Sequence, residues 1–565
     1  MVILGIAGLV HDAASCLIVD GKVVAAAEEE RFWRVKHIGF DEAGGLPYRS
    51  IDYCLKEAGL DYEDIDHVAY YFNPKKEWLK GQKSVVHKTL KSLQAGASSF
   101  VYYADLLRKH FGAERKFNVR RNKKVKFNFL PHHLCHAASA FLVSPFEQSG
   151  LMVLDFVGEG VSTSIGVGRD TNIHMGEGAE FPHSWGLFYA EITQYLGFKP
   201  LNDEYKVMGL ASYGQPSYVE ELEKICTFDD RGLPKINLNF FNPTLQGPGL
   251  FDRKVYEMLG LPRKKNEEIT QKHIDIAASA QQILERGLLK NAEYLAQKHK
   301  VDNLCMAGGV ALNSVANGKI LSSGIFKDIF IQPAAHDAGC ALGAAAYLYA
   351  KLTGKRCEVM ESALLGPSYS NGEIESTLKE AKLRYEKTAE PAKRAAEFIA
   401  KGEIVGWFQG RMEWGPRALG ARSILADPRL VEMKDNLNKW VKHREDFRPF
   451  APSVLEEDAR EYFEDITRSP FMLHVVKVKP QKRSVIPAVT HTDQTARPQT
   501  VSKSVEPLYW SLINEFKKIT SVGVVINTSF NVRGEPIVRT PEEAVRCFYG
   551  TGIDRLVIGD CILSK

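Results

Sequence analysis

Apolar runs of strand length, separated by short polar or glycine-bearing loops, occur in two similar series in the first half of the chain. Residues 2–8 form a continuous apolar run, and residues 15–19 and 22–27 flank Asp20-Gly21, which is a strong two-residue hairpin signal. The same succession of strand, loop and hairpin begins again at residue 151. This pattern predicts an internal duplication of an α/β unit, in which the loops after the first strands face one another across a ligand-binding cleft.

Helical and strand patterns alternate through the rest of this half. Residues 49–58 and 269–298 have helical periodicity, and strand patterns at 303–307 and 328–332 are each followed by a loop and a helix. After the first of these strands, Gly308-Gly309 would let backbone N–H groups approach a phosphate or a ribose.

A break in periodicity divides the chain in two. Residues 355–371 have no regular pattern and contain Gly366-Pro367, so a domain boundary is expected there. We therefore predict a first domain at 1–356, a linker at 357–373 and a second domain at 374–565. In the second domain, a strand at 522–526 is expected to end in a loop formed by Asn527-Thr528-Ser529.

The composition mainly argues against particular classes of protein. The apolar fraction of 44% and the charged fraction of 25% are ordinary for a globular protein, and a net charge of +4 does not by itself indicate nucleic acid. The nine cysteines include no Cys-x-x-Cys pair, no apolar stretch approaches membrane-spanning length, and the N-terminus has no positive leader. These features predict a cytoplasmic, multi-domain enzyme in a reducing compartment. The basic run at 106–126 is predicted to be a solvated connection rather than a phosphate-binding surface.

Four residues from separate segments are candidate metal ligands. His132 and His136 follow Pro131 and lie four apart on a predicted helix, so their imidazoles share one face. Asp155 ends a strand of the second series, and Asp337 lies in the loop before a helix. Each residue taken alone could be a helix-capping, core or loop residue. Together they suit Fe(II), Mn(II) or Zn(II), and affinity does not choose between these ions.

His11 is the candidate proton acceptor. It lies in the loop that would face the metal ligands, where a neutral imidazole could take a proton from an attacking hydroxyl. The structural alternative is a histidine hydrogen-bonded to Asp12 or to a backbone carbonyl.

Seven basic residues of the second domain fall in predicted loops rich in Gly, Pro or Asp. Arginine offers a planar fork to phosphate and carboxylate, and lysine offers a compact charge. Such a density outside helical faces predicts an anion or polyphosphate pocket, formed by Arg411, Arg417, Arg422, Lys442, Arg444, Arg448 and Arg497.

Several longer motifs carry a family resemblance that covers essentially the whole chain. They are Gly5-Ile6-Ala7 with His11-Asp12-Ala13-Ala14-Ser15, His132-His133-x-x-His136-Ala137-Ala138-Ser139-Ala140, Lys206-Val207-Met208-Gly209-Leu210, Gly308-Gly309-Val310-Ala311-Leu312-Asn313, Gly415-Pro416-Arg417-Ala418-Leu419-Gly420-Ala421-Arg422-Ser423 and Asn527-Thr528-Ser529-Phe530-Asn531. With these motifs the chain resembles the NodU/CmcH-type O-carbamoyltransferases, to which the nodulation-factor, cephamycin and tobramycin carbamoyltransferases belong.

The resemblance implies a fold and a two-step reaction. It implies an N-terminal duplicated actin-like, sugar-kinase-like (ASKHA) domain and a C-terminal YrdC-like α/β domain. The second domain would join carbamoyl phosphate and ATP, with Mg(2+), into carbamoyl adenylate, and the first would move the carbamoyl group to an acceptor hydroxyl of a natural product or saccharide, as in antibiotic biosynthesis.

The resemblance also implies roles for individual residues. The iron, Fe(2+), would be held by His132, His136, Asp155 and Asp337, and His11 would be the reactive-centre histidine. The Lys-x-Arg and Ser-x-Asn pairs of the adenylate-forming domain match Lys442, Arg444, Ser529 and Asn531. The remaining motif and cluster residues expected to bind substrate or nucleotide are Lys206, Gly308, Gly309, Asn313, Arg417, Arg422, Arg448, Arg497, Asn527 and Thr528.

Two other functions fit parts of the sequence. An actin-like sugar kinase would release ADP rather than AMP. An RNA-associated factor, similar to threonylcarbamoyl-transfer proteins, would use Arg120, Arg121, Lys123 and Lys124, although nothing else in the sequence indicates RNA. The expected partners are carbamoyl phosphate, ATP and a small-molecule hydroxyl acceptor, with neither membrane nor nucleic acid, and a homodimer is the default oligomer.

Overall fold

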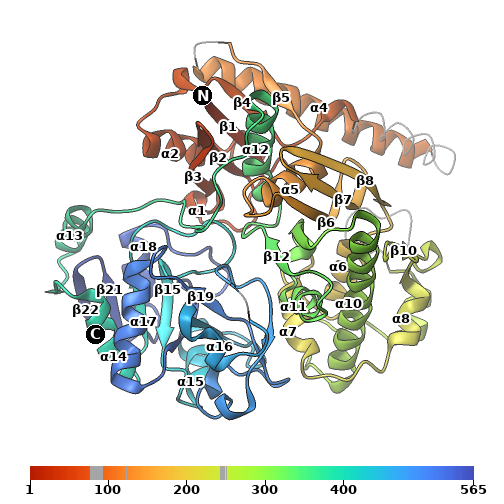
Figure 1. The fold of residues 1–565 in the computed structure, drawn as a ribbon. Coiled ribbons are helices and arrows are strands. Elements are labelled where there is room, and N and C mark those ends of the chain that lie inside the picture. The colour runs from red at the N-terminus through yellow and green to blue at the C-terminus, as the bar shows by residue number, and fades with distance from the viewer. Residues whose placement is uncertain (77–92, 122–123, 242–248, 250, 467) are drawn as a thin grey trace. The chain divides into compact units, whose positions relative to one another are not determined.

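The structure is a computed structural model that describes residues 1–76, 93–121, 124–241, 249, 251–466 and 468–565. The chain forms two compact units (Figure 1). The first contains Met1–Glu29 and His37–Met360, and the second contains Glu30–Lys36 and Glu361–Lys565. A short segment near the N-terminus therefore belongs to the second unit, and the sequence pattern gave no sign of it.

The first sheet of the first unit has five strands in the order β3-β2-β1-β4-β5. Strands β1, β2 and β3 form antiparallel hairpins, and Val19 pairs with Lys22 across Asp20-Gly21, which confirms the predicted turn. Strand β4 pairs in parallel with β1, and β5 pairs in parallel with β4. The strands are β1 (Val2–Ala7), β2 (Ala14–Val19), β3 (Lys22–Glu28), β4 (His67–Tyr70) and β5 (Phe127–Phe129).

The second sheet repeats this plan. Its order is β12-β11-β6-β7-β8, with an antiparallel series of three strands followed by two parallel strands on the other side of the first. Counted within each half, both sheets have the order 3-2-1-4-5, which confirms the predicted duplication. The strands are β6 (Gln148–Gly158), β7 (Val161–Arg169), β8 (Asn172–Glu180), β11 (Asn303–Ala307) and β12 (Asp328–Ile331). Figure 1 labels β6, β7, β8 and β12.

Helices α5 and α12 pack together in this unit and bring the sheets' loops to one place. A Cβ atom at Gly5 would lie 1.8 Å from the carbonyl oxygen of Ala341, and one at Gly343 would lie 1.8 Å from that of Cys135. Glycine therefore permits α12 to contact both β1 and α5 at backbone distance. The helices are α2 (Tyr48–Ala58), α4 (Leu93–Arg121), α5 (His132–Phe141), α6 (Trp185–Tyr195), α7 (Glu204–Ala211), α8 (Val219–Ile225), α9 (Arg253–Leu259), α10 (Gln271–His299), α11 (Ser314–Ser322) and α12 (Gly339–Thr353).

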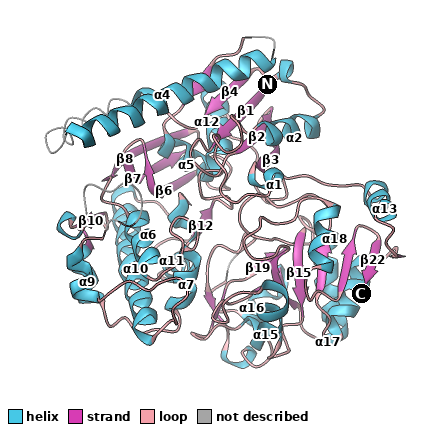
Figure 2. Ribbon diagram, turned by 180° about the vertical axis from the view of Figure 1, so that it is seen from behind, coloured by secondary structure: helices cyan, strands magenta, loops and turns pink. Residues whose placement is uncertain are grey.

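The second unit is built on an eight-stranded sheet of order β13-β22-β21-β14-β15-β20-β16-β19. Helices α14 (Pro391–Ala400), α17 (Pro507–Thr520) and α18 (Pro541–Tyr549) pack against it, as Figure 2 shows for α17 and α18. The strands are β13 (Glu386–Lys387), β14 (Val405–Phe408), β15 (Arg422–Ala426), β16 (Ala451–Leu455), β19 (Gln499–Val501), β20 (Val524–Ser529), β21 (Arg555–Ile558) and β22 (Cys561–Ser564).

Helix α1 (Glu30–Trp33) and the residues after it are anchored within this second unit. Arg31 donates to the carbonyl oxygen of Gly415 at 2.8 Å, and Arg34 donates to that of Ile537 at 2.6 Å. The guanidinium of Arg539 also lies 4.9 Å from the ring centre of Phe32. These hydrogen bonds between residues distant in sequence attach the segment to the second unit.

Three of the predicted loop assignments were wrong. Strand β20 continues through Asn527 and Thr528 to Ser529, since Ser529 still pairs with Ser423 of β15. Arg422 is the first residue of β15 and is fully buried. Lys442 ends a π-helical turn, Leu437–Lys442. Strand pairing and packing with distant segments override the local polar and glycine-rich signals in these places.

The sequence also predicted unpaired cysteines and no membrane-spanning segment. All nine cysteines are free and buried. Among the described residues, no helix is both long enough and apolar enough to cross a membrane.

Candidate functional site

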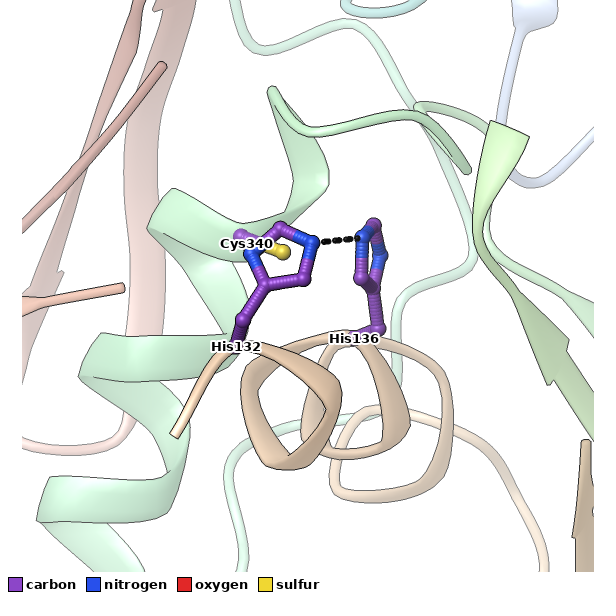
Figure 3. Close-up of side chains that lie close together, drawn as sticks. All are labelled: His132, His136 and Cys340. Carbon is purple, nitrogen blue, oxygen red and sulfur yellow. Dashed lines mark hydrogen bonds between the residues drawn. The ribbon is translucent and has the colours of Figure 1, made fainter. Parts of the chain in front are cut away.

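Four side chains from three segments of the first unit place their donor atoms in one small volume. His132 and His136 lie one turn apart on α5, Asp155 lies on β6, and Asp337 lies in the loop between β12 and α12. All four are buried, and their ligand atoms lie within 4.8 Å of one another. The Nε2 atom of His132 lies 3.1 Å from Nε2 of His136 and 3.2 Å from Oδ2 of Asp155 (Figure 3 shows the two rings). The structure thus brings together the four ligands proposed from the sequence.

The loop after β6 fixes the position of His132. A Cβ atom at Gly158 would lie 1.9 Å from Cδ2 of His132, so a glycine is needed to leave room for the ring. The Oε1 atom of Glu159 accepts hydrogen bonds from the backbone N–H groups of His132, at 3.2 Å, and of Asn73, at 2.5 Å. A carboxylate at this end of α5 also suits the positive end of the helix dipole.

The pKa values of His132, Asp155 and Asp337 are shifted by their neighbours in this cluster. Burial lowers the pKa of His132, but Asp337 and Asp155 together raise it to about 9. Burial raises the pKa of Asp155, while a hydrogen bond from His132 and the charge of His136 hold it well below its usual range. The pKa of Asp337 is lowered against its burial by His132 and His11. The acids are therefore ionised, and the cluster favours a cation.

This donor set fits a divalent metal ion. Two neutral imidazoles and two carboxylates offset a charge of 2+, and the mixture of nitrogen and oxygen donors suits Fe(II), Mn(II) or Zn(II). The donors come from α5, β6 and the loop before α12, so the site exists only when both halves of the duplicated unit are folded together.

Asp12 joins three histidines beside this cluster. Its Oδ2 atom lies 2.9 Å from Nδ1 of His11 and 3.5 Å from Nδ1 of His336, and its Oδ1 atom lies 2.7 Å from Nδ1 of His37. The Nε2 atom of His336 in turn lies 3.3 Å from Oε1 of Glu28. The network orients the His11 ring through one buried carboxylate.

The same acids determine the charge of His11. Burial lowers its pKa, but Asp337, the hydrogen bond to Asp12 and Asp155 raise it to about 10. Because the imidazole is 45% exposed, the acids outweigh burial. His11 is thus protonated near neutral pH unless a cation offsets Asp155 and Asp337.

The glycines expected to approach a ligand lie close to β6. A Cβ atom at Gly308, where φ is +93°, would lie 2.2 Å from the carbonyl oxygen of Leu154. At Gly309, the nearest atom to such a Cβ would be Oδ1 of Asp155, at 3.8 Å. The backbone of Gly309 therefore borders the four-ligand cluster.

The side chains of Asn313 and Lys206 are engaged within the first unit. The Oδ1 atom of Asn313 accepts from the backbone N–H of Ala316 at 3.0 Å and so caps α11, and its amide donates to Gln281 at 2.9 Å. Lys206, buried on α7, donates to Oδ2 of Asp203 at 3.0 Å.

In the second unit, the buried ammonium of Lys442 is surrounded by neutral acceptors. It donates to Oδ1 of Asn531 at 2.9 Å, to the carbonyl oxygen of Asn531 at 3.1 Å, to Oγ of Ser529 at 3.3 Å and to the carbonyl oxygen of Ser529. Burial, followed by the charges of Arg444 and Arg448, holds the pKa of Lys442 well below its usual range. Because these acceptors are neutral, they do not offset the positive charge of a protonated Lys442, and an anionic ligand would do so.

Arginines from separate segments gather near this lysine. Burial lowers the pKa of Arg497, and the charges of Arg417, Arg444 and Arg448 lower it further. Arg444 is held by Oδ1 of Asn438 at 2.7 Å and by the ring of Phe450, whose centre lies 4.4 Å from its guanidinium. Like charges raise each other's energy, so the cluster is stabilised by a bound polyanion.

Other predicted binding residues form hydrogen bonds with neighbouring segments of the second unit. Arg422 donates to the carbonyl oxygens of Gln409, Ala421, Pro367 and Gly410, and its guanidinium lies 3.7 Å from the ring centre of Phe408. Arg411 donates to the carbonyl oxygens of Leu365 and Gly366. The amide of Asn527 donates to Ala418, Ser453 and Gln499. Thr528 is half-buried on β20.

Two family models match the chain. The model described as carbamoyltransferase N-terminus matches residues 2–346, and the one described as carbamoyltransferase C-terminus matches residues 396–565. The chain belongs to the carbamoyltransferase family. It is an enzyme that transfers carbamoyl groups, as the resemblance implied.

Curated relatives of this carbamoyltransferase match it over more than three quarters of each chain. Nodulation protein NolNO of Sinorhizobium fredii is 43% identical over 98% of this chain and 79% of that protein, and nodulation protein NolO of Bradyrhizobium diazoefficiens is 45% identical over 77% and 78%. Nodulation protein U of Rhizobium tropici is 28% identical over 99% and 95%. These matches support neither the sugar kinase nor the RNA-associated factor.

In the basic run at 106–126, Arg120 pairs with Asp52 at 2.7 Å, while Lys123 lies outside the described residues.

Sequence analysis of this carbamoyltransferase missed part of the site in the first unit. It treated Asp12 only as a structural partner of His11 and did not identify His37, His336 or Glu28 as neighbours. The pair His11-Asp12 carried a local signal. The others lie 25, 324 and 16 residues from Asp12 in sequence, and only the folded β1, β3 and β12 loops bring them together.

Proposed function

We propose that this carbamoyltransferase makes carbamoyl adenylate from carbamoyl phosphate and ATP in its second unit, and transfers the carbamoyl group to an acceptor hydroxyl in its first unit. The observation that carries the proposal is the buried Lys442, whose amino group donates to Ser529 and Asn531 at 2.9–3.3 Å and whose pKa is lowered by the charges of Arg444 and Arg448. Arg444 and Arg448 also lower the pKa of Arg497. Both substrates are polyanions, which is the class of ligand such a cluster stabilises.

The proposed domain types have support in the topology. The order 3-2-1-4-5, present twice, supports an actin-like (ASKHA) first domain. The convergence of Lys442 with Ser529 and Asn531 at the end of β20, in a mixed sheet, supports a YrdC-like second domain. We assign carbamoyl transfer to the proposed first domain, 1–356, and carbamoyl adenylate formation to the proposed second domain, 374–565.

In the activation step, water first hydrolyses carbamoyl phosphate to carbamate and inorganic phosphate. A carbamate oxygen then attacks the α-phosphorus of ATP, and pyrophosphate leaves, which gives carbamoyl adenylate. Lys442 and the arginines stabilise the negative charge that develops on the phosphate oxygens. The Mg(2+) that accompanies ATP shares this charge. The depressed pKa of Lys442 means that the ligand's negative charge restores the protonated form, so a proton is taken up as the polyanion binds.

In the transfer step, the acceptor hydroxyl attacks the carbamoyl carbon, AMP leaves, and the hydroxyl proton passes to Nε2 of His11. Asp12 holds the opposite ring nitrogen, Nδ1, at 2.9 Å and so orients the imidazole and stabilises its charged form. Accepting a proton requires the neutral ring, which is favoured when a cation offsets Asp155 and Asp337.

We further propose that His132, His136, Asp155 and Asp337 hold Fe(2+). When bound, the ion would supply Lewis-acid polarisation of a carbonyl or phosphate oxygen. Gly309, whose backbone borders Asp155, leaves space for that oxygen to approach. The proposed acceptor is a small molecule or saccharide hydroxyl, and the proposed protein is cytoplasmic and homodimeric.

The test is the nucleotide product. Release of AMP and pyrophosphate should depend on added carbamoyl phosphate and should fall by about 100-fold or more in Lys442→Ala. Lys439→Ala, which removes an exposed lysine from the same π-helical turn, should retain the wild-type rate. ADP as the product, or ATP consumption indifferent to carbamoyl phosphate, would overturn the proposal.

A further inference from the structure

Cys340 lies against the two histidines of the proposed metal site. It is the second residue of α12, directly follows the loop of Asp337, and is fully buried. Its sulfur and a ring nitrogen of each of His132 and His136 lie within 4.8 Å of one another. Figure 3 shows the thiol over the ring of His132, beside the contact between the two imidazoles. The two histidines therefore belong to two groups of donors, one completed by carboxylates and one by a thiol.

The second ring nitrogen, Nδ1, of each histidine carries no hydrogen bond to another described residue. Metal-binding histidines usually donate their second ring nitrogen to a carboxylate or carbonyl, which fixes the ring. Among the described residues, the buried Nδ1 atoms of His132 and His136 have no hydrogen-bond partner. Both side chains are at most 2% exposed, so water does not replace that partner readily. No second hydrogen bond therefore commits the two rings to the carboxylates, and the donor atoms of each set already lie within 4.8 Å of one another.

The two sets differ in chemical hardness. Carboxylate oxygens of Asp155 and Asp337 suit Fe(II) and Mn(II), whereas a thiolate with imidazoles selects thiophilic ions such as Zn(II) and Cd(II). Three protein donors with an open fourth position are a usual zinc arrangement. Binding through sulfur exchanges the thiol proton for the ion, so one proton is released to solvent for each Cys340 thiolate formed.

We propose that His132, His136 and Cys340 form a second, thiophilic metal-binding set that competes with the His/Asp set for the same two histidines. This inference rests on the proposed function, in which the His/Asp set holds the working ion. A thiophilic ion bound through Cys340 occupies both histidines and therefore excludes Fe(II) or Mn(II) from the site.

The test compares a thiophilic ion with a harder one on the full-length, metal-free protein. Binding of Cd²⁺ and Mn²⁺ is measured by calorimetry, together with the near-ultraviolet sulfur-to-cadmium charge-transfer absorption. Cys340→Ser should weaken Cd²⁺ binding by roughly tenfold or more and abolish that absorption, and should change Mn²⁺ affinity by less than about twofold. Cys305→Ser, a change at another buried cysteine on β11, should alter neither.

The outcomes separate this inference from the function on which it rests. Equal Cd²⁺ affinity in the wild type and Cys340→Ser, or charge-transfer absorption that survives the substitution, overturns the second donor set. Failure of Mn²⁺ to bind the wild type overturns the His/Asp site independently of the cadmium result. Cys340→Ala gives a second, non-polar replacement, and the thermal unfolding of both metal-free variants shows whether the cluster remains folded.

Discussion

The ammonium of Lys442 lies 2.9 Å from the amide oxygen of Asn531, and the same oxygen accepts the hydroxyl of Ser529 at 2.8 Å. An amide oxygen holds the lysine without neutralising it. Asn531→Asp keeps the shape but adds a negative charge, so it should form an ion pair with Lys442 and compete with ATP phosphates. We expect carbamoyl-phosphate-dependent pyrophosphate release to fall by about 10- to 100-fold.

A matched control adds the same charge elsewhere in the second unit. Asn436→Asp, at the end of α15 (Met433–Asn436), should leave the rate within about twofold. Wild-type activity in Asn531→Asp would show that Lys442 does not meet the polyanion.

The depressed pKa of Lys442 predicts proton uptake on ligand binding. Burial, Arg444 and Arg448 lower this pKa in the free protein, and a bound polyanion raises it again. Between the two pKa values, binding of pyrophosphate should therefore take up a proton. Calorimetry in buffers of different ionisation enthalpy measures this number, and Lys442→Met should abolish it. Proton uptake unchanged in Lys442→Met would assign it to another group.

The four candidate metal ligands could be predicted from the sequence because they lie in segments with a recognisable pattern. The His132/His136 spacing and the two similar series of strands were enough to propose that Asp155 and Asp337 meet the histidine helix. Asp12, His37 and His336 lack such a pattern, because each has an ordinary local alternative and their contacts depend on three separate loops.

Glycine-rich context was misleading in the second unit. It suggested that Arg422 lies in a binding loop, but pairing with β14 and β20 makes this residue part of a strand, with its guanidinium bonded to backbone carbonyls. The placement of α1 in the second unit depends on Arg31 and Arg34, whose bonds reach residues 384 and 503 positions away. Such long-range polar contacts leave no periodic trace in the sequence.

Metal affinity in the first unit should depend on pH through His132. Its pKa of about 9 in the metal-free protein, raised by Asp337 and Asp155 against burial, means that an ion must displace a proton below that pH. Apparent Mn²⁺ affinity should thus rise by about tenfold per pH unit from pH 6.5 to 8.5 and level off above pH 9. His132→Ala and Asp337→Ala should each lose the single ion bound per chain.

The pH at which the Mn²⁺ affinity levels off provides a second test of His132. Asp337→Asn removes the main group that raises the pKa of His132, so the affinity of that variant, although lower, should level off at a lower pH. An affinity independent of pH between 6.5 and 8.5 contradicts the involvement of a protonated His132.

The space left by Gly158 should be required for the metal site. In Gly158→Ala, the new methyl group would lie 1.9 Å from Cδ2 of His132 and must displace the ring. We expect metal affinity to fall by about 10- to 100-fold and unfolding free energy to fall by about 1–3 kcal/mol. Gly176→Ala on β8, where the nearest atom would lie at 3.4 Å, should change neither quantity appreciably. Normal metal affinity in Gly158→Ala would show that the ring position is not set by this loop.

Glu506 should make the second unit less stable as pH rises. Burial and the nearby charge of Glu413 raise the pKa of Glu506 from 4.5 to about 8. The folded protein therefore holds a proton that the unfolded chain has lost, so stability is greatest below about pH 4.5 and declines until the pH passes about 8. Glu506→Gln, which resembles the protonated acid, should match the wild type at pH 5 and raise Tm by about 2–4 °C at pH 8.5.

The comparison with an exposed acid isolates burial as the cause. Glu380→Gln, at the end of α13 (Asn371–Glu380), removes the same charge where the side chain is exposed, and its effect on Tm should be small and similar at both pH values. Glu506→Gln differs in charge from the wild type only when the wild-type carboxyl is ionised. A Tm gain of equal size at pH 5 and pH 8.5 would therefore mean that side-chain shape or hydrogen bonding, rather than a buried charge, limits stability at Glu506.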